Sequence, residues 1–209
     1  MSDRVAWHRE TITPAAQDLL SALVDVLPKG AYLAGGTGLA LRYGHRRSVD
    51  LDFFVPDEFA EELLLQRLQT LPGVTAVERA EQTLHLAIQQ IKVSFFGYRY
   101  PVLFPPDTFL GVPVADARDI ACMKITAIAS RGTKRDFVDF FAACGRYGMD
   151  ELLALFDRKY AKTAYNRTHV LKSLTFFADA EKDPMPHMLA PLDWKEVKRY
   201  FEREAPLLR

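Results

Sequence analysis

Two aspartates separated by one residue are the side chains in this sequence best suited to chemistry. Asp50 and Asp52 lie in the apolar stretch Val49–Val55, VDLDFFV. Side chains two residues apart on a β-strand point to the same face, so both carboxylates would share one side of a strand. Two like charges on an apolar strand are unfavourable unless a cation lies between them. The pattern therefore favours a divalent metal ion that carries a polyphosphate.

A glycine-rich turn precedes the two aspartates. Residues 32–34 predict a short buried strand, the run Gly35-Gly36-Thr37-Gly38 follows it, and a helix is then expected to about Tyr43. Glycines at a strand-to-helix turn let the backbone approach a ligand closely. The N-terminus of a helix presents N–H groups and the positive end of the helix dipole to an anion. The turn is therefore a candidate site for a phosphate group.

Two adjacent arginines, Arg46 and Arg47, lie between the predicted helix and the aspartates. A guanidinium group can donate two parallel hydrogen bonds to a phosphate, which suits arginine to a polyphosphate site. The same arginines could instead balance the charges of Asp50 and Asp52. The sequence alone leaves both interpretations open.

The elements that must position these residues indicate an α+β fold with a mixed sheet flanked by helices. Apolar stripes predict packing helices over residues 14–27 and 63–71. Short alternating segments predict strands over residues 74–77, 83–88 and 91–96. In the second of these strands His85 alternates with Leu84 and Leu86, so it faces away from the leucines, and we expect a structural role for it.

Beyond the predicted strands the sequence indicates helices alone. Four prolines between residues 100 and 114 predict a linker-like crossing. Helices are then expected over residues 117–131 and 134–147, and at about 150–160, 167–178 and 193–204. We therefore divide the chain into an α/β core over residues 1–110 and a helical C-terminal region over residues 111–209. The helical region is expected to pack on the core and complete its site.

The overall charge gives no hint of a nucleic-acid partner, because 27 basic and 27 acidic residues balance. The stretch Lys124–Lys172 is locally basic, with ten basic and five acidic residues. An ordinary solvated helical face is the simpler interpretation, and a face that contacts RNA is the alternative. Hydrophobic residues make up 49% of the 209, which is ample for a packed core and argues against a disordered chain.

The cysteines and the hydropathy pattern indicate a cytoplasmic protein. Cys122 and Cys144 lie in apolar helical sequence, which predicts buried free thiols in a reducing compartment. They lack the spacing of zinc ligands. The first ten residues carry charges where a signal peptide needs an apolar run, and no segment approaches the roughly 20 apolar residues of a membrane span. We therefore expect no membrane partner.

Two ordered motifs resemble those of one enzyme family. Gly36-Thr37, followed after twelve residues by Asp50-x-Asp52, resembles the signature of nucleotidyltransferases with the polymerase-beta-like fold. The longer run YLAGGTGLALRYGHRRSVDLDFF is similar to the AbiEii/AbiGii toxin-type nucleotidyltransferases. The later motif of that group is matched by Lys124-x-x-Ala127-x-x-x-Arg131-x-x-x-Arg135-Asp136-x-x-Asp139. Together the matches cover about residues 31–145.

The resemblance implies transfer of a nucleoside monophosphate from an NTP to an acceptor hydroxyl. It implies that Gly36 and Thr37 open a helix that cradles the triphosphate, and that Asp50 and Asp52 hold Mg²⁺, with Mn²⁺ as the alternative ion. Lys124 is then expected to hold the phosphates or to neutralise the leaving pyrophosphate. A lysine that extends past apolar neighbours to reach water is the structural alternative for Lys124.

The second motif supplies further candidates. The resemblance implies that Arg131 binds nucleotide. Asp136 and Asp139 lie three residues apart and so share one helix face. Asp136 is expected to reach the site as a catalytic residue while Asp139 makes a local ion pair. Lys134 or Arg135 could equally pair with these aspartates at the surface.

The resemblance also implies a biological role. It indicates the toxin of a toxin–antitoxin or phage-defence system, with a cognate antitoxin protein as a partner. RNA, such as the 3′ end of tRNA, is then the natural acceptor, and the basic helical half is compatible with it.

One position departs from the pattern of the fold. Many enzymes of this fold carry a third metal-facing carboxylate on a later strand, and Ser94 stands at the expected position here. A catalytically weak or inactive module that binds nucleotide or a partner protein is therefore the alternative function. A metal-dependent phosphohydrolase that uses the same aspartates is a further alternative, although the sequence lacks the His-rich ligand set typical of such enzymes.

Overall fold

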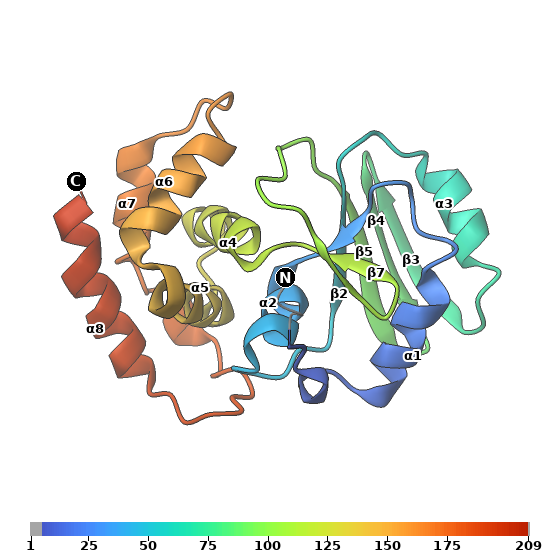
Figure 1. Cartoon of the computed structure of the whole chain (residues 1–209), viewed down its shortest axis with the longest axis horizontal. Coiled ribbons are helices and arrows are strands. Elements are labelled where there is room, and N and C mark those ends of the chain that lie inside the picture. The colour runs from blue at the N-terminus through green and yellow to red at the C-terminus, as the bar shows by residue number, and fades with distance from the viewer. Residues whose placement is uncertain (1–5, 209) are drawn as a thin grey trace, which may run out of the picture. The chain divides into compact units, whose positions relative to one another are not determined.

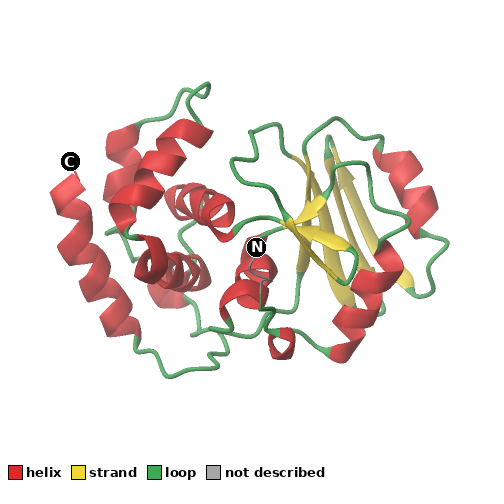
Figure 2. Cartoon of the chain, viewed as in Figure 1, coloured by secondary structure: helices red, strands yellow, loops and turns green. Residues whose placement is uncertain are grey.

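A seven-stranded mixed sheet occupies the first part of the chain, and helices make up the rest (Figure 1, Figure 2). The computed structural model describes residues 6–208 and separates into two units, unit 1 over Met1–Asp116 and unit 2 over Ala117–Arg209. The α+β class predicted from the sequence is confirmed.

The sheet of unit 1 has the strand order β3-β4-β5-β2-β1-β7-β6. Its strands are β1 (Tyr32–Leu33), β2 (Leu51–Val55), β3 (Val74–Ala80), β4 (Thr83–Ile88), β5 (Ile91–Gly97), β6 (Asp107–Phe109) and β7 (Val112–Val114). Strands β3, β4 and β5 form the antiparallel meander that the sequence predicts. Strand β2 lies parallel to β5 and antiparallel to β1, so it occupies the middle of the sheet.

Burial alternates along the central strand and separates two faces of the sheet. Leu51, Phe53 and Val55 are buried, while Asp52 and Phe54 between them are only partly buried. The apolar face belongs to the core of unit 1, which includes leucines of α1 (Pro14–Leu23) and α3 (Glu61–Leu68). Figure 1 shows both helices on one side of the sheet. Asp52 therefore lies on the face opposite to this core.

The described part of unit 1 contains two further helices, η1 (Arg9–Thr11), which is a 3-10 helix, and α2 (Gly35–Tyr43). Helix α1 begins as the sequence predicts, because Pro14 occupies its first turn and the Thr13 hydroxyl accepts a hydrogen bond from the backbone N–H of Ala16.

The predicted linker between residues 100 and 114 is wrong over its second half. Residues 107–114 form the hairpin β6–β7, and β7 pairs with β1 through Val114 and Leu33. Pro113 lies inside β7, opposite Thr108. A proline removes one backbone donor, which a short strand near the edge of a sheet tolerates.

Unit 2 consists of helices around an aromatic core. The helices are α4 (Ala117–Ser130), α5 (Lys134–Tyr147), α6 (Met149–Lys159), α7 (Arg167–Ser173), η2 (Ala180–Lys182), α8 (Trp194–Glu204) and η3 (Ala205–Leu208). The Phe137 ring lies 5.1–5.9 Å, between centroids, from the rings of Phe177, Trp194 and Phe201. These contacts join α5 to α8 and to the loop between α7 and η2.

Both cysteines are buried free thiols, as predicted. Burial raises the pKa of each thiol to about 12, so neither is a reactive thiolate near neutral pH. Within residues 6–208 no helix combines the length and apolar character needed to cross a membrane.

Candidate active site

The glycine-rich run forms the first turn of α2, so this helix begins earlier than the sequence predicts. Gly35 has a φ of +62°, and a Cβ at this position would lie 2.9 Å from Oδ2 of Asp52. Only glycine allows both the left-handed backbone and this close approach without strain. The Ala34 N–H also donates to the Asp52 carbonyl oxygen at 3.0 Å. The start of α2 is therefore fixed against the strand that carries Asp52.

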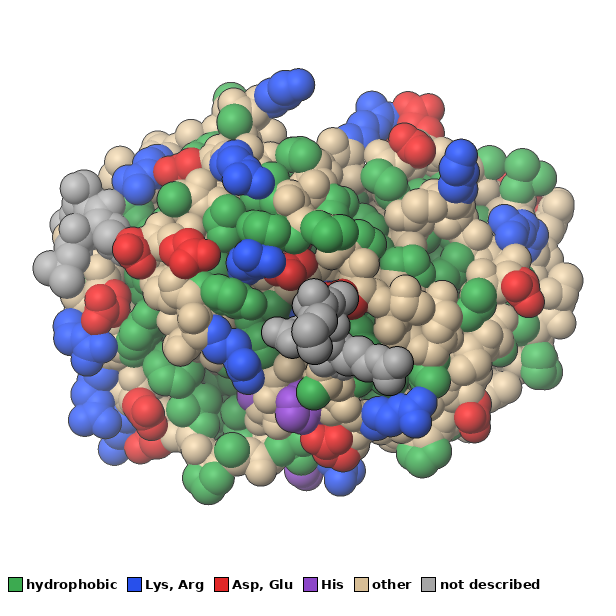
Figure 3. Space-filling model, viewed as in Figure 1, with side chains coloured by type: hydrophobic (Ala, Val, Ile, Leu, Met, Phe, Trp, Pro, Cys, Tyr) green, Lys and Arg blue, Asp and Glu red, His purple; other side chains and the backbone are tan. Residues whose placement is uncertain are grey.

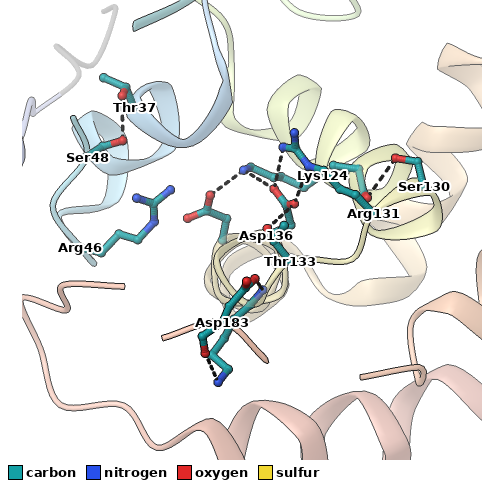
Figure 4. Close-up of polar contacts among 12 residues, drawn as sticks. Thr37, Arg46, Ser48, Lys124, Ser130, Arg131, Thr133, Asp136 and Asp183 are labelled. Atoms are coloured by element: carbon teal, nitrogen blue, oxygen red, sulfur yellow. Dashed lines mark hydrogen bonds and ion pairs between the residues drawn. The ribbon is translucent and has the colours of Figure 1, made fainter. Parts of the chain in front are cut away.

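The buried hydroxyl group of Thr37 links the first turn of α2 to the segment before β2 by a hydrogen bond. Thr37 is 2% exposed, and its hydroxyl donates to the carbonyl oxygen of Asp50. The Ser48 hydroxyl lies 2.8 Å from the Thr37 oxygen (Figure 4). Because Thr37 has one hydroxyl hydrogen and a carbonyl only accepts, Ser48 is the natural donor to Thr37. Ser48 is itself held by its N–H, which donates to the Thr11 carbonyl oxygen at 2.9 Å.

The two aspartates lie where the sequence places them, with one difference. Asp52 is in β2, but Asp50 immediately precedes the strand. Both are partly buried. Ser94 is the Cα partner of Asp52 on the parallel strand β5, so it does occupy the position next to the aspartate. Across residues 6–208, no group of three or more His, Cys, Asp or Glu side chains is arranged to hold a metal.

The N-terminus of α2 is suited to an anion. The backbone N–H groups of the first turn of an α-helix, here residues 35–37, have no acceptor within the helix. They carry the positive end of the helix dipole. The helix ends at Tyr43, and the left-handed conformation of Gly44 just after it lets the Gly44 N–H donate to the Ala40 carbonyl oxygen. The helix therefore offers an anion-binding end beside Asp52.

The two arginines differ in their surroundings. Arg46 is 4% exposed, and its guanidinium group donates to the Arg47 carbonyl oxygen at 2.9 Å. Arg47 is exposed. The loop thus holds one guanidinium inside the protein and presents the other to solvent.

Unit 2 gathers its own charged side chains around one buried lysine (Figure 4). The Lys124 ammonium on α4 lies 2.8 Å from a carboxylate oxygen of Asp136 and 2.7 Å from one of Asp139, both on α5. Lys124 is 6% exposed, and both carboxylates are buried. The interpretation of Lys124 as a lysine that extends to reach water is therefore wrong. The predicted local ion pair of Asp139 is present.

Asp136 has further partners that fix its charge. The Arg131 guanidinium lies 3.1 Å from it, and the Thr133 hydroxyl donates to it at 2.6 Å. Burial alone would raise the pKa of Asp136, but the charges of Lys124 and Arg131 and the hydrogen bonds outweigh burial and lower the pKa to about 2. Asp136 is therefore a carboxylate throughout the physiological range.

Lys134 does not make the alternative surface pair with Asp136. Its ammonium donates to the Asp183 carbonyl oxygen at 2.6 Å and lies 5.3 Å from the centroid of the Trp194 ring.

Thr133 is a partner of Asp136 that the sequence pattern did not lead us to expect. The spacing Thr133-x-x-Asp136 has the form of a helix capping box, which is the signal that could have identified it.

Comparison with known proteins identifies the family. The family described as nucleotidyl transferase AbiEii toxin, type IV toxin–antitoxin system, matches residues 18–209. The uncharacterized protein aq_aa25 of Aquifex aeolicus (strain VF5) is 40% identical over 179 residues, which cover 83% of this chain and 85% of that protein. The chain belongs to the AbiEii nucleotidyltransferase toxin family.

Solved structures show the same fold. MenT4, a nucleotidyltransferase toxin from Mycobacterium tuberculosis H37Rv, is similar with a TM-score of 0.63 at 17% identity, over 93% of this chain and 82% of that chain. JHP933 from Helicobacter pylori is similar with a TM-score of 0.52 at 18% identity, over 94% and 93%. With the family match, this fold makes the chain an NTP-using nucleotidyltransferase, as the motifs predict.

Gly35 gives a first test of the site's construction. The Gly35→Ala change should lower the free energy of unfolding by about 1–2 kcal/mol, because alanine disfavours the left-handed backbone, and the new Cβ should displace the Asp52 carboxylate. Urea denaturation measures this loss. The matched control is Gly145→Ala in α5, where a Cβ would meet nothing within 4 Å; it should be neutral or stabilising by up to about 1 kcal/mol. Equal stability of Gly35→Ala and wild type would contradict the geometry.

Asp136 gives a test by pH. Its pKa is lowered from 3.8 to about 2 in the folded state, so its stabilisation is present above pH 3.8 and is lost as the pH falls towards 2. Between pH 5 and pH 2 the wild type should lose about 2 kcal/mol more stability than Asp136→Asn. Urea denaturation across this range is the measurement. Asp150→Asn changes an exposed aspartate and is the control, so its stability should fall with pH as that of wild type does. If the stability of Asp136→Asn also fell as steeply as that of wild type, the Asp136 carboxylate would not be held as described.

Proposed function

We propose that this chain transfers a nucleoside monophosphate from an NTP to a hydroxyl group of RNA, with Mg²⁺ held by Asp50 and Asp52. The observation that carries the proposal is the contact between the start of α2 and the start of β2. There the backbone of Gly35 lies against the Asp52 carboxylate, and the Thr37 hydroxyl donates to the carbonyl oxygen of Asp50. This contact places the start of α2 against the Asp52 carboxylate, which supports a site where the helix end and the two aspartates hold a metal–triphosphate.

The donor set fits Mg²⁺. This ion prefers oxygen ligands and keeps several waters, so one or two carboxylates and the substrate phosphates suffice to hold it. Asp50 and Asp52 supply those oxygens, and Mn²⁺ accepts the same set. When bound, the ion neutralises charge on the phosphates and polarises the phosphorus that is attacked.

The residues of unit 1 bind and orient the triphosphate in this proposal. The N–H groups of Gly36 and Thr37 donate to phosphate oxygens at the start of α2. Arg46 and Arg47 add positive charge beside the same helix, and the exposed Arg47 is the better placed of the two to donate to a phosphate from solvent. Such contacts position the nucleotide, which is the largest part of catalysis in phosphoryl and nucleotidyl transfer.

The residues of unit 2 contribute charge. Lys124 is the proposed contact to the phosphates and to the leaving pyrophosphate, and Arg131 is a second nucleotide contact. Asp136 binds both cations at 2.8 and 3.1 Å. It therefore keeps Lys124 charged and fixes its direction, and this is the catalytic role that we propose for Asp136.

RNA is the proposed acceptor, with the 3′ end of tRNA as the first candidate. Three lysines of the basic stretch are buried in unit 2, namely Lys124, Lys134 and Lys159. The other seven basic residues are exposed: Arg131, Arg135, Arg146, Arg158, Lys162, Arg167 and Lys172. Acidic and basic side chains are interspersed on the face shown in Figure 3. The exposed excess of basic side chains supports contact with RNA phosphates, and a cognate antitoxin protein is the proposed regulatory partner.

The test is transfer of label from α-phosphate-labelled NTPs to total RNA in the presence of Mg²⁺. Wild type should label RNA, and Asp50→Asn/Asp52→Asn should lower the rate at least 100-fold because the phosphate charge is no longer neutralised. Periodate-oxidised tRNA, which lacks an intact 3′-terminal diol, should accept no label.

Asp57→Asn is the matched control, because Asp57 is an exposed aspartate just beyond β2. It should label RNA at the wild-type rate. Equal labelling by wild type and the double variant would overturn the assignment of Asp50 and Asp52. Label on oxidised tRNA would exclude the 3′ end as the acceptor.

A nucleotide-binding module without turnover is the second candidate function. Ser94 favours it, because a serine rather than a carboxylate is paired with Asp52. Tight NTP binding in calorimetry with no release of pyrophosphate would establish this alternative.

A further inference from the structure

Four polar residues form one row across the sheet of unit 1. Asp52 on β2 is paired with Ser94 on β5, and Ser94 is paired with His85 on β4. His85 is paired in turn with Glu78 on β3. Cross-strand partners point to the same face of a sheet. This polar row, Asp52–Ser94–His85–Glu78, therefore extends along the face that carries the aspartate of the candidate active site.

The imidazole of His85 is held in a defined position within the row. Its Nδ1 lies 3.1 Å from the Ser94 hydroxyl oxygen. Its ring meets the Phe96 ring edge-on, with centroids 5.3 Å apart and an interplanar angle of 72°. Ser94 is 1% exposed, whereas His85 is only partly buried. Among the described residues no hydrogen bond engages Nε2 of His85.

The reaction needs a group that accepts a proton, and Ser94 cannot supply it. The acceptor hydroxyl must lose its proton as its oxygen attacks the α-phosphorus. A serine hydroxyl is neutral and weakly basic, so Ser94 does not replace a carboxylate in this role. A neutral imidazole can accept a proton near pH 7. When Nδ1–H of His85 donates to Ser94, Nε2 carries the lone pair.

We infer that His85 is the general base of the transfer reaction and that Ser94 is its positioning residue. The inference rests on the proposed function, and it assigns a chemical role to a histidine that the sequence analysis treated as structural. Asp52 and His85 are two strands apart, so their Cα atoms are separated by roughly twice the interstrand spacing of about 4.8 Å.

The step is balanced in atoms and charge. The acceptor O–H gives its proton to Nε2 of His85, and the acceptor oxygen forms a bond to the α-phosphorus. The bond from that phosphorus to the oxygen bridging the α- and β-phosphates breaks, and pyrophosphate leaves with the electron pair. His85 becomes an imidazolium that returns its proton to solvent.

The charged groups around His85 in the sheet are Glu78 on β3, Asp52 two strands away, and Lys92, which lies two residues before Ser94 on the same face of β5. Two of these three groups are carboxylates.

The experiment measures the pH dependence of label transfer at saturating NTP. In His85→Gln the rate constant should fall 100- to 10,000-fold, while NTP binding measured by calorimetry stays unchanged. The wild-type rate should fall on acidification as the imidazole becomes protonated, and this acid limb should be absent from His85→Gln. Ser94→Ala should keep the limb and lower the rate about tenfold. Glu78→Gln, which alters an exposed member of the polar row, is the matched control and should remain within threefold of wild type.

The outcomes separate this inference from the proposed function. A His85→Gln protein that binds NTP and transfers label within threefold of wild type overturns the inference and leaves the proposed function standing. A His85→Gln protein that keeps the acid limb assigns His85 a structural role and also overturns the inference. A wild-type protein that transfers no label overturns both.

Discussion

The structure of unit 1 depends on one packing contact, at which the start of α2 is fixed against the start of β2. Two carboxylates must be held beside a helix end that attracts anions, and this requires close backbone approach. Gly35 permits it because it has no Cβ to meet Asp52. The bond from the Ala34 N–H to the Asp52 carbonyl and the bond from the Thr37 hydroxyl to the Asp50 carbonyl use main-chain acceptors. These two bonds fix the backbone of the segment that carries both aspartates.

Unit 2 contains a buried positive charge that its neighbours neutralise. An ammonium buried to the extent of Lys124 would be costly alone, so Asp136 and Asp139 neutralise it at 2.8 and 2.7 Å. Arg131 and Thr133 then complete the contacts of Asp136. The arrangement keeps a lysine both charged and fixed in direction. In the proposed function, preorganised charge of this kind would need little rearrangement when a polyphosphate binds.

Local patterns predicted most of the fold and most of the candidate residues. The alternation along β2, β4 and β5 and the apolar stripes of the helices gave elements close to those observed, and two ordered motifs gave the family. The hairpin β6–β7 was missed because Pro105 and Pro106 precede it and Pro113 lies within it, a pattern typical of a linker. Pairing of β7 with β1 makes residues 112–114 a strand. The contact between His85 and Ser94 was also missed. It depends on the register between β4 and β5, and that register is set by residues distant in sequence.

The central claim is that Asp50 and Asp52 hold a metal–nucleotide complex. Electron paramagnetic resonance of Mn²⁺, titrated with a non-hydrolysable NTP analogue, tests it most directly because bound and free Mn²⁺ give distinct spectra. Wild type should bind one Mn²⁺ in the presence of the analogue, and Asp50→Asn/Asp52→Asn should bind none at the same concentrations. Equal Mn²⁺ binding by the two proteins would contradict the assignment of the aspartates.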